Sequence, residues 1–314
     1  MPETAFSLPS FAKINLGLKV IGKRPDGFHD ICTVFQTVTL HDTISFEPSS
    51  AIEMTCSDPS IPCDQGNLVL RAAETLQAHI LEQRLPISGE MVGHSERFPG
   101  AKMHLEKNIP SPGGLGGGSS NAAVALIGLA RLWNVQIGES ELALIGANLG
   151  SDVPFFFTGG TAVGWGRGTD LSSINDFRAE NVLIATPQID VRTADAFNAL
   201  NAPNLTTSEV NRILGVCRSE AESADFHPGA MRNDFENTVF AAHPEVGKVK
   251  QRLLELGASA ASLSGSGASV FGIFEKKETR RAAQKALDNE VNWRKFAVAT
   301  ISRNEYREAL EIAF

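Results

Sequence analysis

The 314-residue chain has no apolar stretch that approaches the roughly 18 residues a membrane-spanning helix needs. Its first residues, Met1 to Ala5, lack the basic start and apolar run of a signal peptide. With 42% hydrophobic and 20% charged residues, the chain has the material for a packed globular protein of about two domains. These features predict a cytoplasmic protein with no membrane partner.

Paired cysteines, metal-ligand histidine spacings and excess positive charge are also missing. The four cysteines contain no C-x-x-C pair, and a chain of this length builds a core without disulfides. The seven histidines show no H-x-x-x-H spacing, so no protein-held metal site is predicted. The formal net charge of -8 gives no general basic surface for nucleic acid. A small-molecule partner fits better, and any metal is expected to arrive with a nucleotide.

Apolar periodicity predicts a β-rich beginning followed by helices. Residues 12–20 alternate as a half-buried strand does, so Lys13 and Asn15 share its polar face. A turn is predicted over 22–27 and a second strand over 31–46. Helices are predicted over 67–80, 119–133 and 140–148, with a Pro- and Gly-broken connection over 84–101 and a strand over 103–109.

Beyond Gly160 the pattern of predicted elements changes. Turns are predicted over 164–170, strands over 181–186 and 269–274, and helices over 193–200 and 243–256. This change predicts a domain boundary near residue 165, with domains 1–165 and 166–314.

The most specific chemical feature is a glycine-rich stretch directly before a predicted helix. It reads Gly113-Gly114-Leu115-Gly116-Gly117-Gly118-Ser119-Ser120. Glycine lets a backbone approach a ligand closely, and the unpaired N–H groups at a helix start suit phosphate. The two serine hydroxyls could bind phosphate oxygens or Mg²⁺. Because so many glycines cost chain entropy, phosphate binding is favoured over a plain turn.

Two familiar nucleotide motifs do not fit this stretch. A Walker loop requires lysine where Ser119 stands. A Rossmann fingerprint starting at Gly114 also meets Ser119 where its third glycine belongs, and Pro110-Ser111-Pro112 interrupts the tight strand-to-helix turn. A Rossmann oxidoreductase is therefore disfavoured.

Several other positions keep two interpretations each on spacing alone. Lys13 could stabilise charge on a transferring phosphoryl group, or be a solvated lysine on an edge strand. Asp152 could accept a proton, cap a helix, or do both. Phe28 and His29 could meet a ligand or be a packing ring beside a surface histidine. The Ser/Gly-rich residues 262–268 fit a plain loop as well as a ligand contact.

Taken in chain order, these pieces resemble the motif series of the GHMP kinases. The series comprises residues 12–16, 27–29, 110–121, 149–154 and 264–268. Within that superfamily, Gly27-Phe28-His29, the stretch from Gly113 and the segment Arg232-Asn233-Asp234-Phe235-Glu236 are similar to the diphosphocytidyl-methylerythritol kinases. The resemblance spans nearly the whole chain. It implies an α+β fold with an S5-like N-terminal domain, a ferredoxin-like C-terminal domain and a site between them.

The resemblance also implies an activity. An ATP-dependent kinase of this kind transfers the γ-phosphoryl group to the 2-hydroxyl of diphosphocytidyl-methylerythritol in non-mevalonate isoprenoid precursor biosynthesis, with Mg²⁺ carried on the nucleotide. By analogy, Asp152 is the base or orienting carboxylate, and Lys13 holds Asp152 and steadies the developing charge. The protein is expected to be a monomer or a weak homodimer.

The binding residues that the resemblance implies fall into two groups. ATP is expected to lie against Lys107, Pro110, Ser111, Pro112, Gly113, Gly114, Leu115, Gly116, Gly117, Gly118, Ser119 and Ser120. The cytidine end of the substrate is expected to meet Asn15, Phe28, His29 and Phe197, with Phe28 and Phe197 on opposite faces of the base.

Pro112 departs from the family pattern, because relatives usually carry glycine there. Proline fixes φ and removes an N–H donor, so the start of the loop is expected to be displaced while residues 113–120 stay intact. Two alternatives remain. A GHMP kinase for a different alcohol is disfavoured by Gly-Phe-His, and a non-catalytic nucleotide sensor of the same fold is disfavoured by the presence of both Lys13 and Asp152.

Overall fold

The computed structural model describes residues 5–87, 99–200, 202–203, 205–223 and 231–312. Two long antiparallel strands, β1 (Phe6–Lys23) and β2 (His29–Ser49), begin the fold and confirm the predicted β-rich start. Strand β2 also pairs with β4 (Gly100–Glu106) and β5 (Thr161–Gly166). Strands β3 (Ile52–Cys56) and β6 (Asp170–Ser173) complete a six-stranded sheet in the order β3-β4-β2-β5-β6, with β1 beside β2.

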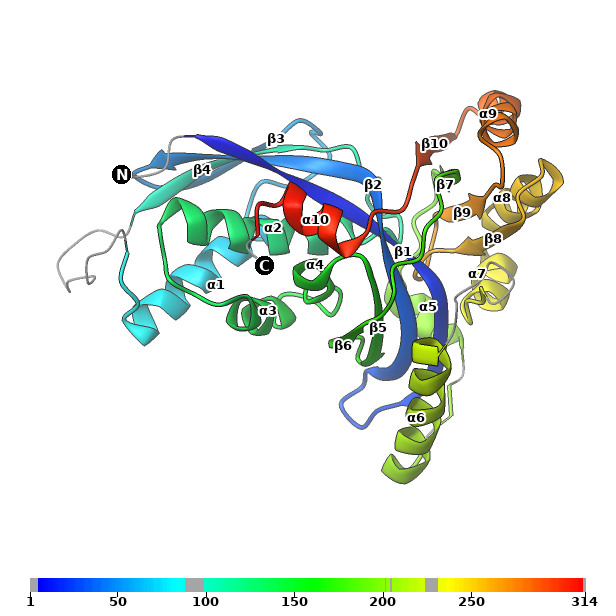
Figure 1. Ribbon diagram of the computed structural model, residues 1–314, viewed down its shortest axis with the longest axis horizontal. Helices are drawn as coiled ribbons and strands as arrows, with labels where there is room; N and C mark the ends of the chain where they lie inside the picture. The colour runs from blue at the N-terminus through cyan, green and yellow to red at the C-terminus, as the bar shows by residue number, and fades with distance from the viewer. Residues whose placement is uncertain (1–4, 88–98, 201, 204, 224–230, 313–314) are drawn as a thin grey trace.

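Helices cover one side of this sheet (Figure 1). The three predicted helices are confirmed as α1 (Leu68–Gln83), α2 (Gly117–Leu132) and α3 (Glu139–Ala147). The short α4 (Phe155–Thr158) and the C-terminal α10 (Arg303–Ala309) join them in the largest hydrophobic core. The Tyr306 hydroxyl of α10 donates a 2.5 Å hydrogen bond to the Phe156 carbonyl. The end of the chain therefore returns to the first sheet.

The second sheet has four antiparallel strands in the order β10-β7-β9-β8. These strands are β7 (Val182–Pro187), β8 (Ala260–Leu263), β9 (Val270–Ile273) and β10 (Trp293–Val298). Helices α5 (Thr193–Ala199), α6 (Thr207–Ser223), α7 (Glu236–Ala242) and α8 (Pro244–Glu255) separate β7 from β8. Helix α9 (Lys277–Ala286) and the short η2 (Leu287–Asn289) precede β10. This β-α-β-β-α-β order confirms the expected ferredoxin-like arrangement.

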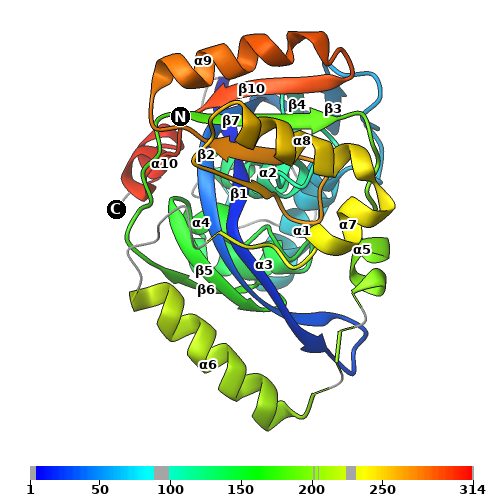
Figure 2. The ribbon, with the colours of Figure 1, turned by 90° about the vertical axis from the view of Figure 1, so that its right-hand side faces the viewer.

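The two sheets share a core. Ile14 and Leu16 of β1 are fully buried and belong to the same hydrophobic cluster as Ile184 of β7 and Phe271 of β9. Helix α6 lies against β1, β2 and β5 of the first sheet (Figure 2). The first sheet runs to the end of β6 and the second begins at β7, while the boundary near residue 165 stays a prediction.

The predicted turn over 164–170 is wrong at both ends. Gly164 to Gly166 belong to β5 and Asp170 opens β6, so the turn covers only residues 167–169. Gly164 is needed inside a strand because a Cβ there would lie 2.7 Å from the Phe35 ring. Most of the predicted connection over 84–101 lies outside the described residues. Among the described helices, none is long and apolar enough to cross a membrane.

Candidate active site

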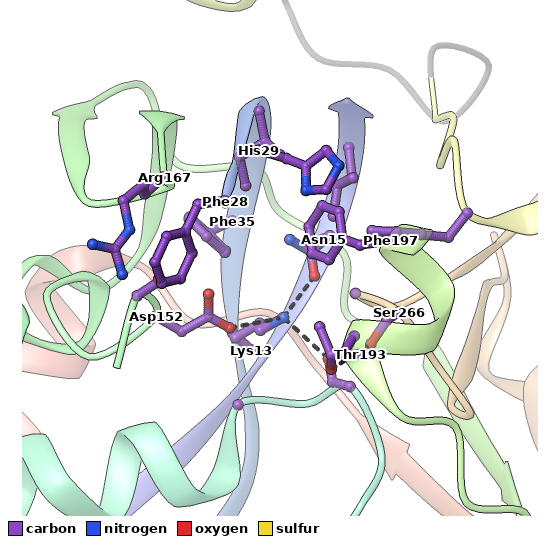
Figure 3. A pocket seen from close by; sticks show the side chains of 18 of the residues that line it. Lys13, Asn15, Phe28, His29, Phe35, Asp152, Arg167, Thr193, Phe197 and Ser266 are labelled. Carbon is purple, nitrogen blue, oxygen red and sulfur yellow. Dashed lines mark hydrogen bonds and ion pairs between the residues drawn. The ribbon is translucent and has the colours of Figure 1, made fainter. Parts of the chain in front are cut away.

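A cavity of about 560 Å³ opens where β1, the glycine loop and α5 meet. It brings together six of the predicted site side chains and two glycines of the predicted loop (Figure 3). Its lining consists of Lys13, Asn15, Leu18, Gly27, Phe28, His29, Ile31, Phe35, Gly114, Gly116, Ser151, Asp152, Arg167, Thr193, Ala194, Phe197, Asn198, Phe235, Gly265 and Ser266.

Lys13 and Asp152 form an ion pair in this cavity. The Lys13 Nζ lies 3.4 Å from the Asp152 Oδ2, and the lysine side chain is only 4% exposed whereas that of Asp152 is 33% exposed. The ammonium also donates to the Asn15 Oδ1 at 2.7 Å and to the Gly114 carbonyl at 3.1 Å. A buried ammonium needs such partners, so Lys13 is not a solvated edge lysine. The carboxylate remains accessible from the cavity.

Asn15 is itself held in place. Its Nδ2 donates to the Thr33 Oγ1 at 2.8 Å, and the threonine hydroxyl donates to the Gly17 carbonyl at 2.7 Å. Because the amide nitrogen is committed to β2, the Asn15 oxygen faces Lys13. This chain of bonds fixes the direction of the ammonium.

Asp152 sits in the turn before α4 without capping that helix. The N-cap residue of α4 is Pro154, and no side-chain capping bond is present there. The Asp152 carboxylate forms the ion pair with Lys13 instead, and its role as a proton acceptor stays a prediction.

The glycine loop is fixed by backbone contacts on both sides. The Lys13 N–H donates to the Leu115 carbonyl at 2.9 Å, and the Ser269 N–H donates to the Gly113 carbonyl at 3.1 Å. Gly114 and Gly116 have φ values of 70° and 69°, which glycine adopts without strain. A Cβ on Gly114 would lie 2.1 Å from the Ser264 carbonyl oxygen. The loop therefore leads into α2 with its first N–H groups unpaired, as a phosphate site requires.

The loop's polar side chains have different surroundings. Ser119 is partly exposed, whereas Ser120 is fully buried and accepts a hydrogen bond from the Ser10 hydroxyl at 2.8 Å. Ser111 and Pro112 are exposed. Of the two serines at the start of α2, Ser119 is therefore the one whose hydroxyl is open to a ligand, and the effect of Pro112 on the loop's start stays a prediction.

Lys107 lies beneath the loop rather than among the residues that line the cavity. Its Nζ is 2.9 Å from the fully buried Asp42 Oδ2 and also donates to the Ile109 carbonyl. The other Asp42 oxygen accepts from the Asn108 and Ile109 N–H groups at 2.7 Å each. Burial lowers the pKa of Lys107 against the opposing effect of Asp42. These contacts fix the chain leading into the loop.

Aromatic rings form the opposite end of the cavity. His29 stacks on Phe197 with ring centroids 4.7 Å apart, and Phe197 meets Phe235 edge-on at 4.8 Å. Phe28 stands on the other side of the cavity, with its residue 47% exposed (Figure 3). Burial, followed by the charge of Lys23, lowers the pKa of His29, so its ring is neutral at pH 7. This end offers flat apolar faces and a neutral hydrogen-bonding ring.

The segment Arg232 to Glu236 ties the two sides of the site together. The Asn233 Nδ2 donates to the Leu263 and Gly265 carbonyls at 2.8 Å each, and Glu236 accepts from the Leu263 N–H at 3.0 Å. Asp234 accepts from the Val20 N–H of β1 at 2.8 Å. This segment thus joins β1 to the Ser/Gly-rich loop after β8.

Sequence reasoning missed several residues of the site. Arg167 comes from the turn between β5 and β6, and a single arginine between glycines carries no local signal. Thr193 was also missed. Its hydroxyl lies 2.9 Å from that of Ser266, which belongs to the Ser/Gly-rich stretch, and only the fold brings the two together. Asp42 lies in a strand far from Lys107 in sequence, so its role was equally hidden.

The fold and this site agree with comparisons to known proteins. Residues 67–160 match the N-terminal domain of GHMP kinases, and residues 220–292 match their C-terminal domain. The chain therefore belongs to the GHMP kinases, a family of ATP-dependent kinases.

Within that family its relatives include the 4-diphosphocytidyl-2-C-methyl-D-erythritol kinases. The chain is 39% identical to the one from Solibacter usitatus, with 96% of this chain and 90% of that protein covered. It is 35% identical to the one from Clostridioides difficile, with 89% and 90% covered. A crystal structure of 4-(cytidine 5'-diphospho)-2C-methyl-D-erythritol kinase superposes with a TM-score of 0.70 at 28% identity, covering 94% of this chain and 99% of that one.

Kinases with much lower sequence identity share the fold alone. A homoserine kinase from Cytophaga hutchinsonii superposes with a TM-score of 0.68 at 17% identity, covering 96% of each chain.

Proposed function

We propose that this protein phosphorylates the 2-hydroxyl of 4-diphosphocytidyl-2-C-methyl-D-erythritol with ATP, giving the 2-phosphate and ADP in non-mevalonate isoprenoid precursor biosynthesis. The observation that carries the proposal is the position of the Lys13–Asp152 pair. It lies between the glycine-rich loop and the aromatic end of the cavity, in a chain whose curated relatives carry this substrate in their names.

The Lys13–Asp152 pair suits the chemical step. A hydroxyl placed beside the accessible Asp152 carboxylate donates a hydrogen bond to it. As its oxygen bonds to the γ-phosphorus of ATP, its proton passes to Asp152, and the bond from that phosphorus to the bridging oxygen breaks so that ADP leaves. The Lys13 ammonium, held by Asn15 and Gly114, keeps Asp152 oriented and offsets the charge that develops on the transferring phosphoryl group.

The glycine loop suits ATP. The unpaired N–H groups at the start of α2 face where the nucleotide phosphates would lie, and the Ser119 hydroxyl is exposed to them. We propose that Mg²⁺ enters on the nucleotide. Among the described residues no cluster of carboxylates, histidines or cysteines could hold a metal by itself.

The aromatic end suits the cytidine. Phe28 and Phe197 stand on opposite sides of the cavity, so a pyrimidine could stack against either ring. The neutral His29 and the Asn198 amide offer hydrogen-bonding groups to the base edge. This arrangement supports the predicted roles of Phe28, His29 and Phe197.

The test is ADP release from ATP and Mg²⁺ with the cytidylyl alcohol, run beside homoserine, mevalonate and galactose. Turnover only with the cytidylyl alcohol is the expected result. Turnover with another alcohol would keep the kinase chemistry and discard the cytidine subsite. ATP binding without any turnover would favour a non-catalytic sensor.

A further inference from the structure

Arg167 is the charged residue of the cavity that the proposed chemistry leaves unused. It lies in the turn after β5, and its guanidinium carbon stands 3.6 Å from the centre of the Phe28 ring. Its Nε is buried and has no hydrogen-bond partner. A buried donor usually has a partner, so the guanidinium of this cavity-lining residue is incompletely satisfied by the protein.

The charges around the cavity leave Arg167 uncompensated. Lys13 is neutralised by Asp152, and His29 is neutral. Within the described parts of the chain, no carboxylate lies within ion-pair distance of Arg167. Asp26, which senses its charge, is bonded instead to Arg24 and to the Phe28 N–H. The cavity's lining therefore carries one surplus positive charge, at Arg167.

We propose that Arg167 recognises the diphosphate of a nucleoside diphosphate ester whose base occupies the aromatic subsite. This inference rests on the proposed function and names a determinant of its substrate specificity. Arg167 lies on the face of Phe28 turned away from His29 and Phe197 (Figure 3). Phe28 can then stack on the base with one face and hold the guanidinium with the other, which keeps the positive charge beside the bound nucleoside in the same cavity. A planar guanidinium binds phosphate oxygens through two parallel hydrogen bonds, for which lysine is a poor substitute.

Such a kinase binds two phosphate-bearing nucleotides, the cytidylyl diphosphate ester and ATP, so the experiment must separate them. Isothermal titration should measure the affinities of CDP, cytidine and ADP for the wild type and for Arg167→Gln and Arg167→Lys. Arg178→Gln serves as a matched control, because the Arg178 side chain is 71% exposed and its ion pair with Glu305 is long, at 3.9 Å. Thermal melts confirm that each variant is folded.

The expected result is selective. Arg167→Gln should weaken CDP binding about tenfold to a hundredfold, the effect of losing a charge-assisted bond to phosphate, and leave cytidine and ADP affinities unchanged. Arg167→Lys should recover part of the CDP affinity, and the wild-type preference for CDP over cytidine should shrink as salt rises.

Other outcomes overturn the inference. An equal loss for cytidine and CDP would make Arg167 only a brace for Phe28. A loss confined to ADP would place its phosphate partner on the ATP side, and unchanged CDP binding would remove it from recognition. Wild-type protein that binds ADP but neither cytidine nor CDP would instead contradict the proposed function itself.

Discussion

The two ends of the cavity are built by different means. At the glycine loop, backbone hydrogen bonds to Lys13 and Ser269 and the buried Asp42–Lys107 pair fix the chain. At the aromatic end, the rings of Phe28, His29 and Phe197 form much of the surface, and Phe28 is half exposed with Arg167 stacked upon it. One end is held by the fold, whereas the other is held by contacts that a ligand can replace.

This difference matches what each end would bind. The fold is shared with a homoserine kinase at only 17% identity, so the backbone features can be common to kinases with different alcohols. The aromatic side chains can change without altering that backbone. Substitutions at the loop end should therefore affect stability, and substitutions at the aromatic end should affect substrate selection.

The largest effect is expected at Asp42. Asp42→Asn leaves the Lys107 ammonium buried without its carboxylate, which costs about 3–5 kcal/mol in the free energy of unfolding. Urea denaturation would measure it. The double variant Asp42→Asn/Lys107→Met should recover part of the loss, and Glu255→Gln, which breaks an exposed pair with Arg252, should change little. A stable Asp42→Asn protein with poor ATP affinity would show that Lys107 serves the nucleotide directly.

Asp152→Asn tests the Lys13–Asp152 pair, which lies between the two ends of the cavity. It removes the proton acceptor while keeping the side-chain shape, so kcat should fall about a hundredfold or more, equivalent to about 2.7 kcal/mol. ATP affinity should be retained, because Asp152 lies outside the loop. Steady-state ADP release and nucleotide titration measure the two quantities. Near-normal turnover would refute the assignment.

Phe28→Ala should act on the substrate alone. Loss of a stacking face is worth about 1–3 kcal/mol, so the KM for the cytidylyl alcohol should rise about fivefold to a hundredfold. The KM for ATP and the free energy of unfolding should stay nearly constant, because the ring is half exposed. Phe28→Tyr, which keeps the ring, is the control. An equal rise in both KM values would mean that Phe28 does not act on the substrate alone.

The smallest effect is expected from His29. Its pKa in the folded state is lowered, so below about pH 6.5 the unfolded chain takes up a proton before the folded one does. Stability should therefore fall as pH drops through this window, and His29→Gln should show a shallower fall. Unfolding free energies at pH 7.5 and pH 5.5, at about room temperature, compare the two slopes. Parallel slopes would mean that the folded His29 titrates normally.

The sequence predicted those parts of the structure that are determined by residues close together in the chain. The glycine loop and α2 follow from adjacent residues, and the alternation of β1 placed Lys13 beside Asn15. The pairing of Lys13 with Asp152 was reachable only through the family resemblance, because the two lie far apart in sequence.

Several elements that escaped prediction have weak or polar patterns. Helix α9 (Lys277–Ala286) buries Arg280 and Ala283, and alanines are its apolar residues, so little apolar content marks it in the sequence. Strand β10 has just its end residues, Trp293 and Val298, fully buried. Helix α6 is also largely polar. These segments form because the second sheet and its neighbours supply the burial that their own sequences lack.

The bulges in β1 have a consequence for how this protein can change in length. Its pairing with β2 shifts register between Phe11 and Lys13 and again between Asn15 and Gly17. Successive strand residues point to opposite faces, so deleting one residue here would turn the ammonium toward the shared core and an apolar group toward the cavity. Surface loops tolerate insertions and deletions of single residues. The same changes within residues 11–17 of β1 would misplace Lys13, even if the hydrophobic content of the strand stayed the same.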